Sequence, residues 1–349
     1  MKKNMKHVLI ASGVAAATAI CAGALHRLLG KTLMTVAMDR KAPKAVTKQK
    51  EKLMGSGELS AFLKMAMDNA AILEGDDQIK TVEITAPDGV RLVGHWKSVE
   101  SPKRVLVAMH GWRTSWSQDF AIISKFWHDS GCCVLYAEQR GQGESGGDYM
   151  GFGVVERYDC LEWAKWAAEN TSEELPIYLC GLSMGGTTVL MTADLDLPER
   201  VHGIMSDCAF TSPHGIWKHV VQNNLHIPYG LYHTVAGDIY RKKLSIDPKD
   251  GSCPEALKRC RVPVSFIHGT DDHFVPLSHT FENYKACASE KRLLVVPGAD
   301  HGLSYLVDRE GYEAFCKSFW REFDDSIPEV ALPEDAACEK ETEECKEEC

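Results

Sequence analysis

The sequence lacks any pair of cysteines with Cys-x-x-Cys spacing, although its 349 residues include 13 cysteines. This absence argues against zinc ribbons and thioredoxin-like redox sites. Cys132, Cys133 and Cys180 lie in apolar, strand-like runs, where cysteine usually serves as a small buried hydrophobic residue. Because the number of cysteines is also odd, we expect mostly free thiols rather than a disulfide framework.

The central part of the chain also lacks an excess of basic residues. Residues 1–52 carry 11 Lys/Arg and 2 acidic residues, whereas residues 329–349 carry 2 lysines and 9 acidic residues. Since the whole chain has a formal charge of −10, the net charge of residues 53–328 is −12. An acidic body of this kind argues against a nucleic-acid substrate.

A long uncharged run lies near the N-terminus. Residues 8–25 contain no charged side chain and follow three lysines. As a helix this run would span about 27 Å, close to the roughly 30 Å of a bilayer core. We therefore expect residues 1–30 to hold an apolar helix that anchors the protein in a membrane. The alternatives are a signal peptide cleaved near Ala22-Gly23-Ala24, which would give a secreted protein, and a soluble apolar helix. Basic residues on both sides leave the orientation open.

Composition separates the body from its two flanks. Residues 31–52 are predicted to be a basic linker, and residues 329–349 an acidic disordered tail. The body, residues 53–328, starts with apolar residues at helical spacing, which predict a helix packed on the rest: Leu59, Phe62, Leu63, Ala66, Ala70 and Leu73. The tail cysteines, Cys338, Cys345 and Cys349, have irregular spacing and no histidine among them, which argues against a metal site.

The body alternates apolar strands with amphipathic helices. This pattern predicts an α/β protein with a mostly parallel sheet covered by helices on both faces. The predicted strands are residues 79–86, 90–99, 104–109, 132–137, 177–182, 201–206, 262–268 and 292–296, and the predicted helices are residues 116–130, 154–170, 278–289 and 304–323. Functional residues are then expected in loops at the carboxyl ends of the strands.

The segment Gly181-Leu182-Ser183-Met184-Gly185-Gly186 follows an apolar run and precedes a helix-forming run. A Gly-x-Ser-x-Gly between strand and helix is typical of the nucleophile elbow of serine hydrolases. The tight turn requires residues without side chains two positions before and after the serine, whose hydroxyl then lies at the positive end of a helix. Taken alone, the segment also fits a glycine-rich turn with an incidental serine.

Reactive side chains follow three further predicted strands. His110 follows the strand at 104–109, the group from His268 to His273 lies at the end of the strand at 262–268, and Asp300 and His301 follow the strand at 292–296. With Ser183, the chain order is serine, aspartate, histidine, which is the order of the α/β-hydrolase triad.

Five short motifs share this order and spacing. They are His-Gly-Trp at 110–112, Arg-Gly-Gln-Gly-Glu-Ser-Gly-Gly at 140–147, the Ser183 segment, Gly-Thr-Asp-Asp-His-Phe-Val-Pro at 269–276, and Ala-Asp-His-Gly at 299–302. On these motifs, residues 79–323 resemble α/β-hydrolase fold proteins, in particular the serine-aminopeptidase-like and Bem46/YqkD-like serine hydrolases. The 140–147 motif lacks a lysine after its glycines, which argues against a phosphate loop.

The resemblance implies roles for particular residues. Ser183 is the expected nucleophile, His301 its general base and Asp272 the acid that orients the imidazole. Asp271 and Asp207 remain alternatives for the acid. His110 competes with His301 for the base but is expected to brace a loop. The backbone N–H groups of Trp112 and Met184 are the expected oxyanion donors.

The segment after the strand at 201–206 is the expected lid. Residues 208–260 are predicted to form a small helical lid over the acyl pocket, with Trp116, Phe210 and Trp217 as apolar walls. The expected function is that of a carboxylesterase that forms an acyl-enzyme with short-to-medium acyl esters. It needs no metal or cofactor, and its partners are a small acyl substrate and the membrane, not nucleic acid.

The sequence leaves other functions open. A serine-aminopeptidase-like amidase, a thioesterase or an acyltransferase would use the same residues. A non-catalytic, membrane-tethered binding protein is an alternative of another class. Serine at position 183 argues against the dehalogenase and epoxide hydrolase branches, which use aspartate there.

Overall fold

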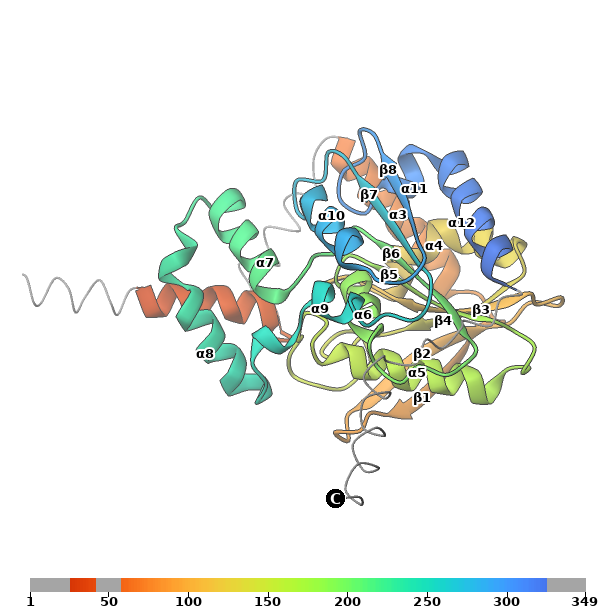
Figure 1. Ribbon diagram of the computed structural model, residues 1–349, viewed down its shortest axis with the longest axis horizontal. Coiled ribbons are helices and arrows are strands. Elements are labelled where there is room, and N and C mark those ends of the chain that lie inside the picture. Colours follow the sequence, from red (N-terminus) through yellow and green to blue (C-terminus); the bar gives the residue numbers. More distant parts are fainter. Residues whose placement is uncertain (1–25, 42–57, 325–349) are drawn as a thin grey trace, which may run out of the picture.

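The computed structural model describes residues 26–41 and 58–324 (Figure 1). The predicted membrane helix at 8–25, the second half of the predicted linker (residues 42–52) and the acidic tail at 329–349 lie outside these residues. Within the described ranges, no helix has the length and apolar character that a membrane span requires.

An eight-stranded sheet forms the centre of the protein, with strand order β1-β2-β4-β3-β5-β6-β7-β8. The hairpin pair β1–β2 and the pair β2–β4 are antiparallel, and every other neighbouring pair is parallel. The mostly parallel sheet is therefore confirmed. The strands are β1 (Lys80–Thr85), β2 (Arg91–Lys97), β3 (Arg104–Met109), β4 (Cys132–Ala137), β5 (Ile177–Leu182), β6 (Val201–Asp207), β7 (Val264–Gly269) and β8 (Lys291–Val296).

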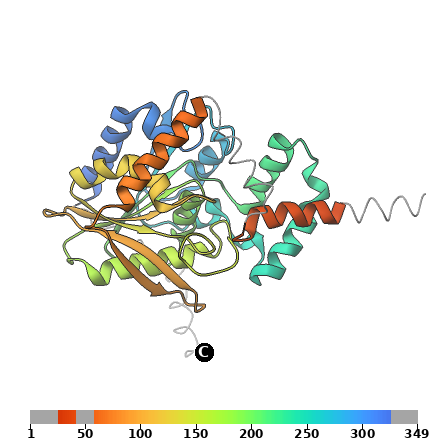
Figure 2. The ribbon, with the colours of Figure 1, turned by 180° about the vertical axis from the view of Figure 1, so that it is seen from behind.

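Helices cover both faces of this sheet, as Figures 1 and 2 show from opposite sides. One face packs against α3 (Glu58–Glu74), α4 (Trp116–Asp129), α11 (Ser304–Val307) and α12 (Arg309–Phe323). The other packs against α5 (Glu156–Asn170), α6 (Met184–Thr192), α9 (Cys253–Leu257) and α10 (Leu277–Ala286). The predicted helix at 304–323 is divided at Asp308, whose carboxylate accepts a hydrogen bond from the N–H of Gly311 and caps α12.

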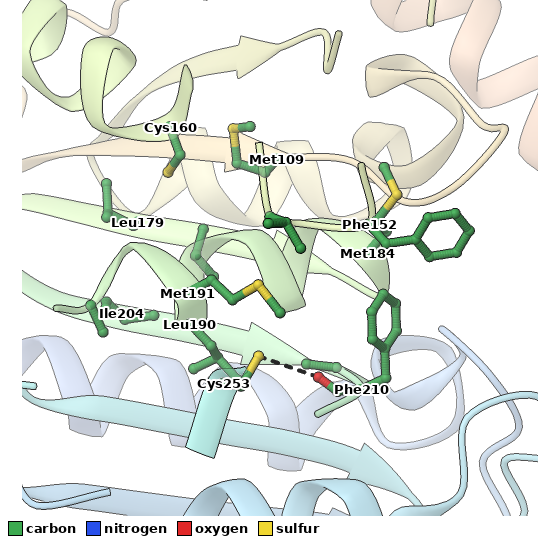
Figure 3. Packing of buried hydrophobic residues seen from close by; sticks show 14 of the residues in the cluster. Met109, Phe152, Cys160, Leu179, Met184, Leu190, Met191, Ile204, Phe210 and Cys253 are labelled. Carbon is green, nitrogen blue, oxygen red and sulfur yellow. Dashed lines mark hydrogen bonds between the residues drawn. The ribbon is translucent and has the colours of Figure 1, made fainter. Parts of the chain in front are cut away.

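The core around α6 is tightly packed. Figure 3 shows Met109 of β3, Met184 and Met191 of α6, and Phe210 after β6 within the buried cluster that surrounds α6. Nine cysteines in the described ranges are free and buried, as expected for cysteine used as a small hydrophobic residue. This packing holds the start of α6 in place, which is where the Ser183 turn lies.

The segment 208–260, where the sequence predicts a lid, is largely helical, and most of its helices lie to one side of the sheet. In addition to α9, this segment contains α7 (Pro213–His219), the π-helical turn η1 (Val220–Asn224), the 3₁₀ turn η2 (Tyr229–Leu231), α8 (His233–Leu244) and the 3₁₀ turn η3 (Pro248–Asp250). Figures 1 and 2 show a further helix, residues 26–38, lying between α7 and α8.

This helix corrects the linker predicted from residue 31. Residues 31–38 are helical, and Met34 and Met38 on one side of the helix are buried. Gly30 lies so close to Val235 of α8 that a side chain at position 30 would collide with it. The prediction was wrong because it relied on positive charge, whereas the apolar residues at helical spacing provide a face that packs on the lid.

Candidate active site

Ser183 occupies a sharp turn between β5 and α6. Its backbone has φ 56° and ψ −115°, a strained conformation for a residue with a side chain. A Cβ at Gly181 would overlap the carbonyl of Gly185, and a Cβ at Gly185 would overlap the carbonyl of Met109. Any side chain at Gly181 or Gly185 would therefore clash with the backbone, which explains why the motif has glycine at both positions.

The turn presents the Ser183 hydroxyl to His301 and, through it, to Asp272. His301 Nε2 lies 2.9 Å from Ser183 Oγ, and His301 Nδ1 lies 2.7 Å from Asp272 Oδ2. The other carboxylate oxygen of Asp272 accepts hydrogen bonds from the N–H groups of Phe274 at 2.9 Å and Val275 at 2.7 Å. The structure thus brings together three side chains that are far apart in the sequence.

His268, which the sequence indicated only as a strand-end histidine, is a second partner of this acid. Its Nε2 lies 2.8 Å from the carbonyl oxygen of Val275 and 3.2 Å from Asp272 Oδ2, so Nε2 carries the proton. Its Nδ1 then accepts the hydroxyl hydrogen of Thr280 at 2.7 Å. Burial alone would raise the pKa of Asp272, but hydrogen bonds from His268 and His301 more than offset this and hold it well below its ordinary value. The one sequence signal for His268 was the presence of a histidine inside an apolar strand.

The alternative acids are placed differently. Asp271 is exposed and accepts a hydrogen bond from the hydroxyl of Thr270 at 2.7 Å. Asp207 is buried at the end of β6, its carbonyl accepts the N–H of Ser183 at 2.9 Å, and burial raises the pKa of its carboxyl to about 6. Of these carboxylates, the one in hydrogen-bond contact with His301 is Asp272.

His110 is buried under the loop that follows β3. Its Nε2 accepts the N–H of Gln139 at 3.1 Å, and burial lowers its pKa. In the same loop, the N–H of Gly111 donates to the carboxylate of Asp119 at 2.6 Å, and the N–H of Arg113 donates to the side-chain oxygen of Gln142 at 2.5 Å. These bonds fix the loop on both sides of Trp112.

Trp112 lines a cavity together with Ser183, and Met184 follows Ser183 directly in the chain. Among the hydrogen bonds of the described residues, none joins the backbone N–H of Trp112 or Met184 to a protein acceptor. Sequence reasoning missed Asp119, a carboxylate whose pKa is raised by burial and which accepts from both Gly111 and the Thr114 hydroxyl. Its signal was a lone acid in the first turn of an apolar helix.

Two cavities meet at Ser183, with volumes of about 520 Å³ and 230 Å³. Trp112 and Phe274 line both of them, whereas Phe210 and Trp217 line the smaller one. Trp116 lines neither cavity. Its buried ring stacks on His95 with ring centroids 4.3 Å apart, because the first turn of α4 faces the sheet. The expected pocket role of Trp116 was therefore wrong.

One potential metal-ligand set lies within the described residues. Atoms of Cys208, Asp272 and His301 lie within 4.8 Å of one another. Burial raises the pKa of the Cys208 thiol well above its ordinary value, and Asp272 already accepts hydrogen bonds at both oxygens. A protonated thiol and an engaged carboxylate are poor metal ligands.

Comparison with known proteins extends this description. The family model for the prolyl oligopeptidase family matches residues 117–323, more than half of the chain. The YqkD protein of Bacillus subtilis is 22% identical over 268 residues, covering 76% of this chain and 88% of its own. Human ABHD12B is 29% identical over 198 residues, covering 52% of this chain and 51% of its own.

Solved structures show the same fold. An esterase from Pyrococcus furiosus has a TM-score of 0.56 at 22% identity, covering 70% of this chain and 91% of its own. Acetyl xylan esterase 1 from Thermoanaerobacterium sp. has a TM-score of 0.51 at 18% identity, covering 76% of this chain and 93% of its own. The resemblance to α/β-hydrolases, including YqkD-like proteins, is confirmed. The chain belongs to the prolyl oligopeptidase family and is a hydrolase with the α/β-hydrolase fold.

Proposed function

We propose that this protein is a serine hydrolase, in which Ser183 is the nucleophile, His301 the general base and Asp272 the orienting acid. The observation that carries the proposal is the unbroken hydrogen-bonded series from Ser183 Oγ to Asp272, placed where two cavities meet. A serine hydroxyl is a weak nucleophile until a neighbouring base accepts its proton.

The reaction follows from these positions. Ser183 Oγ attacks the carbonyl carbon of the substrate while His301 Nε2 takes the hydroxyl proton, and ionised Asp272 stabilises the resulting imidazolium. His301 then gives this proton to the leaving group, which departs and leaves an acyl ester on Ser183. A water molecule then attacks this ester while His301 takes one of its protons. The bond between Ser183 Oγ and the acyl carbon breaks, His301 returns the proton to Ser183 Oγ, and the carboxylic acid is released.

The developing oxyanion needs donors that are already in place. The N–H groups of Trp112 and Met184 supply them in this proposal, and each such donor contributes about 10²–10³ in rate. Asp119 and Gln142 support this role because they hold the N–H groups on either side of Trp112. The donor loop is therefore fixed before substrate binds.

We propose that the substrate is a carboxylic ester with a short-to-medium acyl chain. Among the described residues, no charged side chain lines the 230 Å³ cavity beside Ser183, so an uncharged, apolar acyl group fits it. The same residues would serve an amidase, a thioesterase or an acyltransferase, so the leaving group and acceptor have to be determined by assay.

A fluorophosphonate probe tests the proposal on the purified full-length protein. We expect covalent labelling of the wild type, loss of labelling in Ser183→Ala, and unchanged labelling in Ser278→Ala, an exposed serine used as control. Hydrolysis of p-nitrophenyl acetate and butyrate should follow the same pattern, and matched p-nitroanilides and thioesters would rank the leaving groups. Absence of labelling and hydrolysis in the wild type would support the non-catalytic binding protein instead.

A further inference from the structure

We infer that the helix of residues 26–38 is part of the substrate site, where it encloses the acyl chain of a medium-chain ester together with the lid. The leaving alcohol then faces the larger cavity. This inference rests on the proposed function of Ser183, and it assigns the substrate class and the residues that limit its length.

The smaller cavity is built jointly by three parts of the chain. Leu33 and Met34 come from the helix of residues 26–38, Trp217 and Tyr229 from the lid, and Ser183 from the catalytic turn. The helix is therefore a wall of the same space into which the serine projects.

The position of His301 determines which cavity takes which part of the substrate. His301 lines the 520 Å³ cavity and is not among the residues that line the 230 Å³ cavity. A general acid must lie within hydrogen-bond reach of the leaving-group oxygen. The leaving alcohol therefore belongs on the side of the larger cavity, and the acyl chain extends from Ser183 into the smaller one.

Specific contacts hold this wall against the lid and against the loop that carries Met150. Asp39, just after the helix, is 2.6 Å from Lys243 Nζ of α8, and the N–H of Met150 donates to the carbonyl of Met38 at 2.8 Å. The close packing of Gly30 on Val235 fixes the other end of the helix on the lid. A wall held at both ends sets a defined limit to the depth of the pocket.

An apolar pocket of limited depth produces a characteristic chain-length profile. Each buried CH₂ group contributes about 0.8 kcal/mol, which is about fourfold in kcat/KM. We expect kcat/KM to rise from acetate to a medium-chain ester and then to fall once the cavity of about 230 Å³ is full.

Two opposite substitutions at Leu33 of the full-length protein test this inference. Leu33→Trp fills the pocket, so kcat/KM for p-nitrophenyl octanoate should fall at least tenfold, while that for acetate changes less than threefold. Leu33→Ala enlarges it, so the preferred chain should lengthen. Leu28→Trp, at a 62% exposed position of the same helix, is the matched control and should leave the profile unchanged.

Binding of octanoate in a Ser183→Ala background separates this inference from the proposed function, since it requires no hydrolysis. Calorimetry should detect binding that Leu33→Trp abolishes and Leu28→Trp retains, even if no ester is cleaved. A profile that both Leu33 variants lower equally at every chain length, or octanoate binding that Leu33→Trp leaves unchanged, would overturn the inference.

Discussion

The indole Nε1 of Trp112 donates a hydrogen bond of 2.7 Å to the carbonyl oxygen of Ala37, which lies 75 residues earlier in the chain. The guanidinium of Arg113 donates to two further carbonyls of the same segment, those of Val36 at 2.7 Å and Asp39 at 2.6 Å. The loop after β3 is thus tied to the end of the helix of residues 26–38. Because this loop carries the proposed oxyanion donor, its geometry depends on a segment outside the sheet and its covering helices.

Removing the Arg113 guanidinium should weaken catalysis without changing chain-length preference. Arg113→Ala leaves the Val36 and Asp39 carbonyls without their donor and lets the Trp112 N–H move. Misplacement of a catalytic group by about 1 Å costs up to about 10² in rate. We expect kcat for p-nitrophenyl esters to fall about 10–100-fold at every chain length. Arg27→Ala, at an exposed position of the helix of residues 26–38, is the control, and equal rates for both variants would argue against an anchoring role of Arg113.

Replacing the carboxylate of Asp272 should affect the reaction far more than the fold. Asp272→Asn retains an oxygen for the N–H groups of Phe274 and Val275 but no longer stabilises the imidazolium of His301. We expect kcat to fall about 10⁴-fold with a small change in melting temperature.

The neighbouring acid provides the matched control for this substitution. Asp271→Asn changes an exposed carboxylate one position away and should retain most of the activity. The reverse result, a near-normal rate for Asp272→Asn and a large loss for Asp271→Asn, would move the acid to position 271.

His279 should make the stability of the protein depend on pH. Its Nδ1 accepts hydrogen bonds from the N–H of Thr211 at 3.2 Å and from the Thr211 hydroxyl at 3.0 Å, which join the start of the lid to α10. Burial lowers the pKa of His279 to about 4. The unfolded chain, with an ordinary histidine pKa of about 6.5, therefore binds the proton first as the pH falls.

The contribution of His279 is thus present above about pH 6.5 and is lost as the pH falls toward 4, at a cost of about 1–3 kcal/mol in unfolding free energy. In His279→Asn the amide oxygen still accepts from Thr211 but does not titrate. Urea unfolding at pH 7 and pH 4.5 should show a smaller pH effect in His279→Asn than in the wild type. An exposed control, His273→Asn, should follow the wild type, and parallel profiles for all three proteins would refute the assignment.

We propose that residues 8–25, which lie outside the described residues, anchor the protein in a membrane. The full-length protein should remain in the membrane pellet after a carbonate wash. The double substitution Ala16→Arg and Ala17→Arg should release it, since each arginine at a helix centre costs about 2.5–3.5 kcal/mol. Ala16→Leu with Ala17→Leu is the control. A mature N-terminus beginning near residue 24 would indicate a cleaved signal peptide instead.

Much of the fold could be predicted from the sequence because its signals are local. All eight predicted strands are present, and each of their bounds lies within two residues of its predicted position, since alternating and continuous apolar runs directly reflect burial in a sheet. The helix of residues 26–38 and the side-chain direction of Trp116 were not predicted correctly. Both depend on what lies opposite in space, which charge and residue type alone do not encode.

The sequence by itself indicated the turn at Ser183, because glycines two positions before and after the serine are the local signature of this turn. Gly181 is required within the turn, where a Cβ would meet the carbonyl of Gly185, whereas Gly185 is required by the Met109 carbonyl of β3. The sequence left three carboxylates open as partners of His301. Only the tertiary structure decided among them, by bringing the loop after β7 and the loop after β8 to one edge of the sheet, where Asp272 lies 2.7 Å from His301. The tertiary structure likewise placed the helix of residues 26–38 against Trp112. Such contacts join residues tens of positions apart, and their geometry arises from the packing of whole elements, so it leaves no local pattern in the chain.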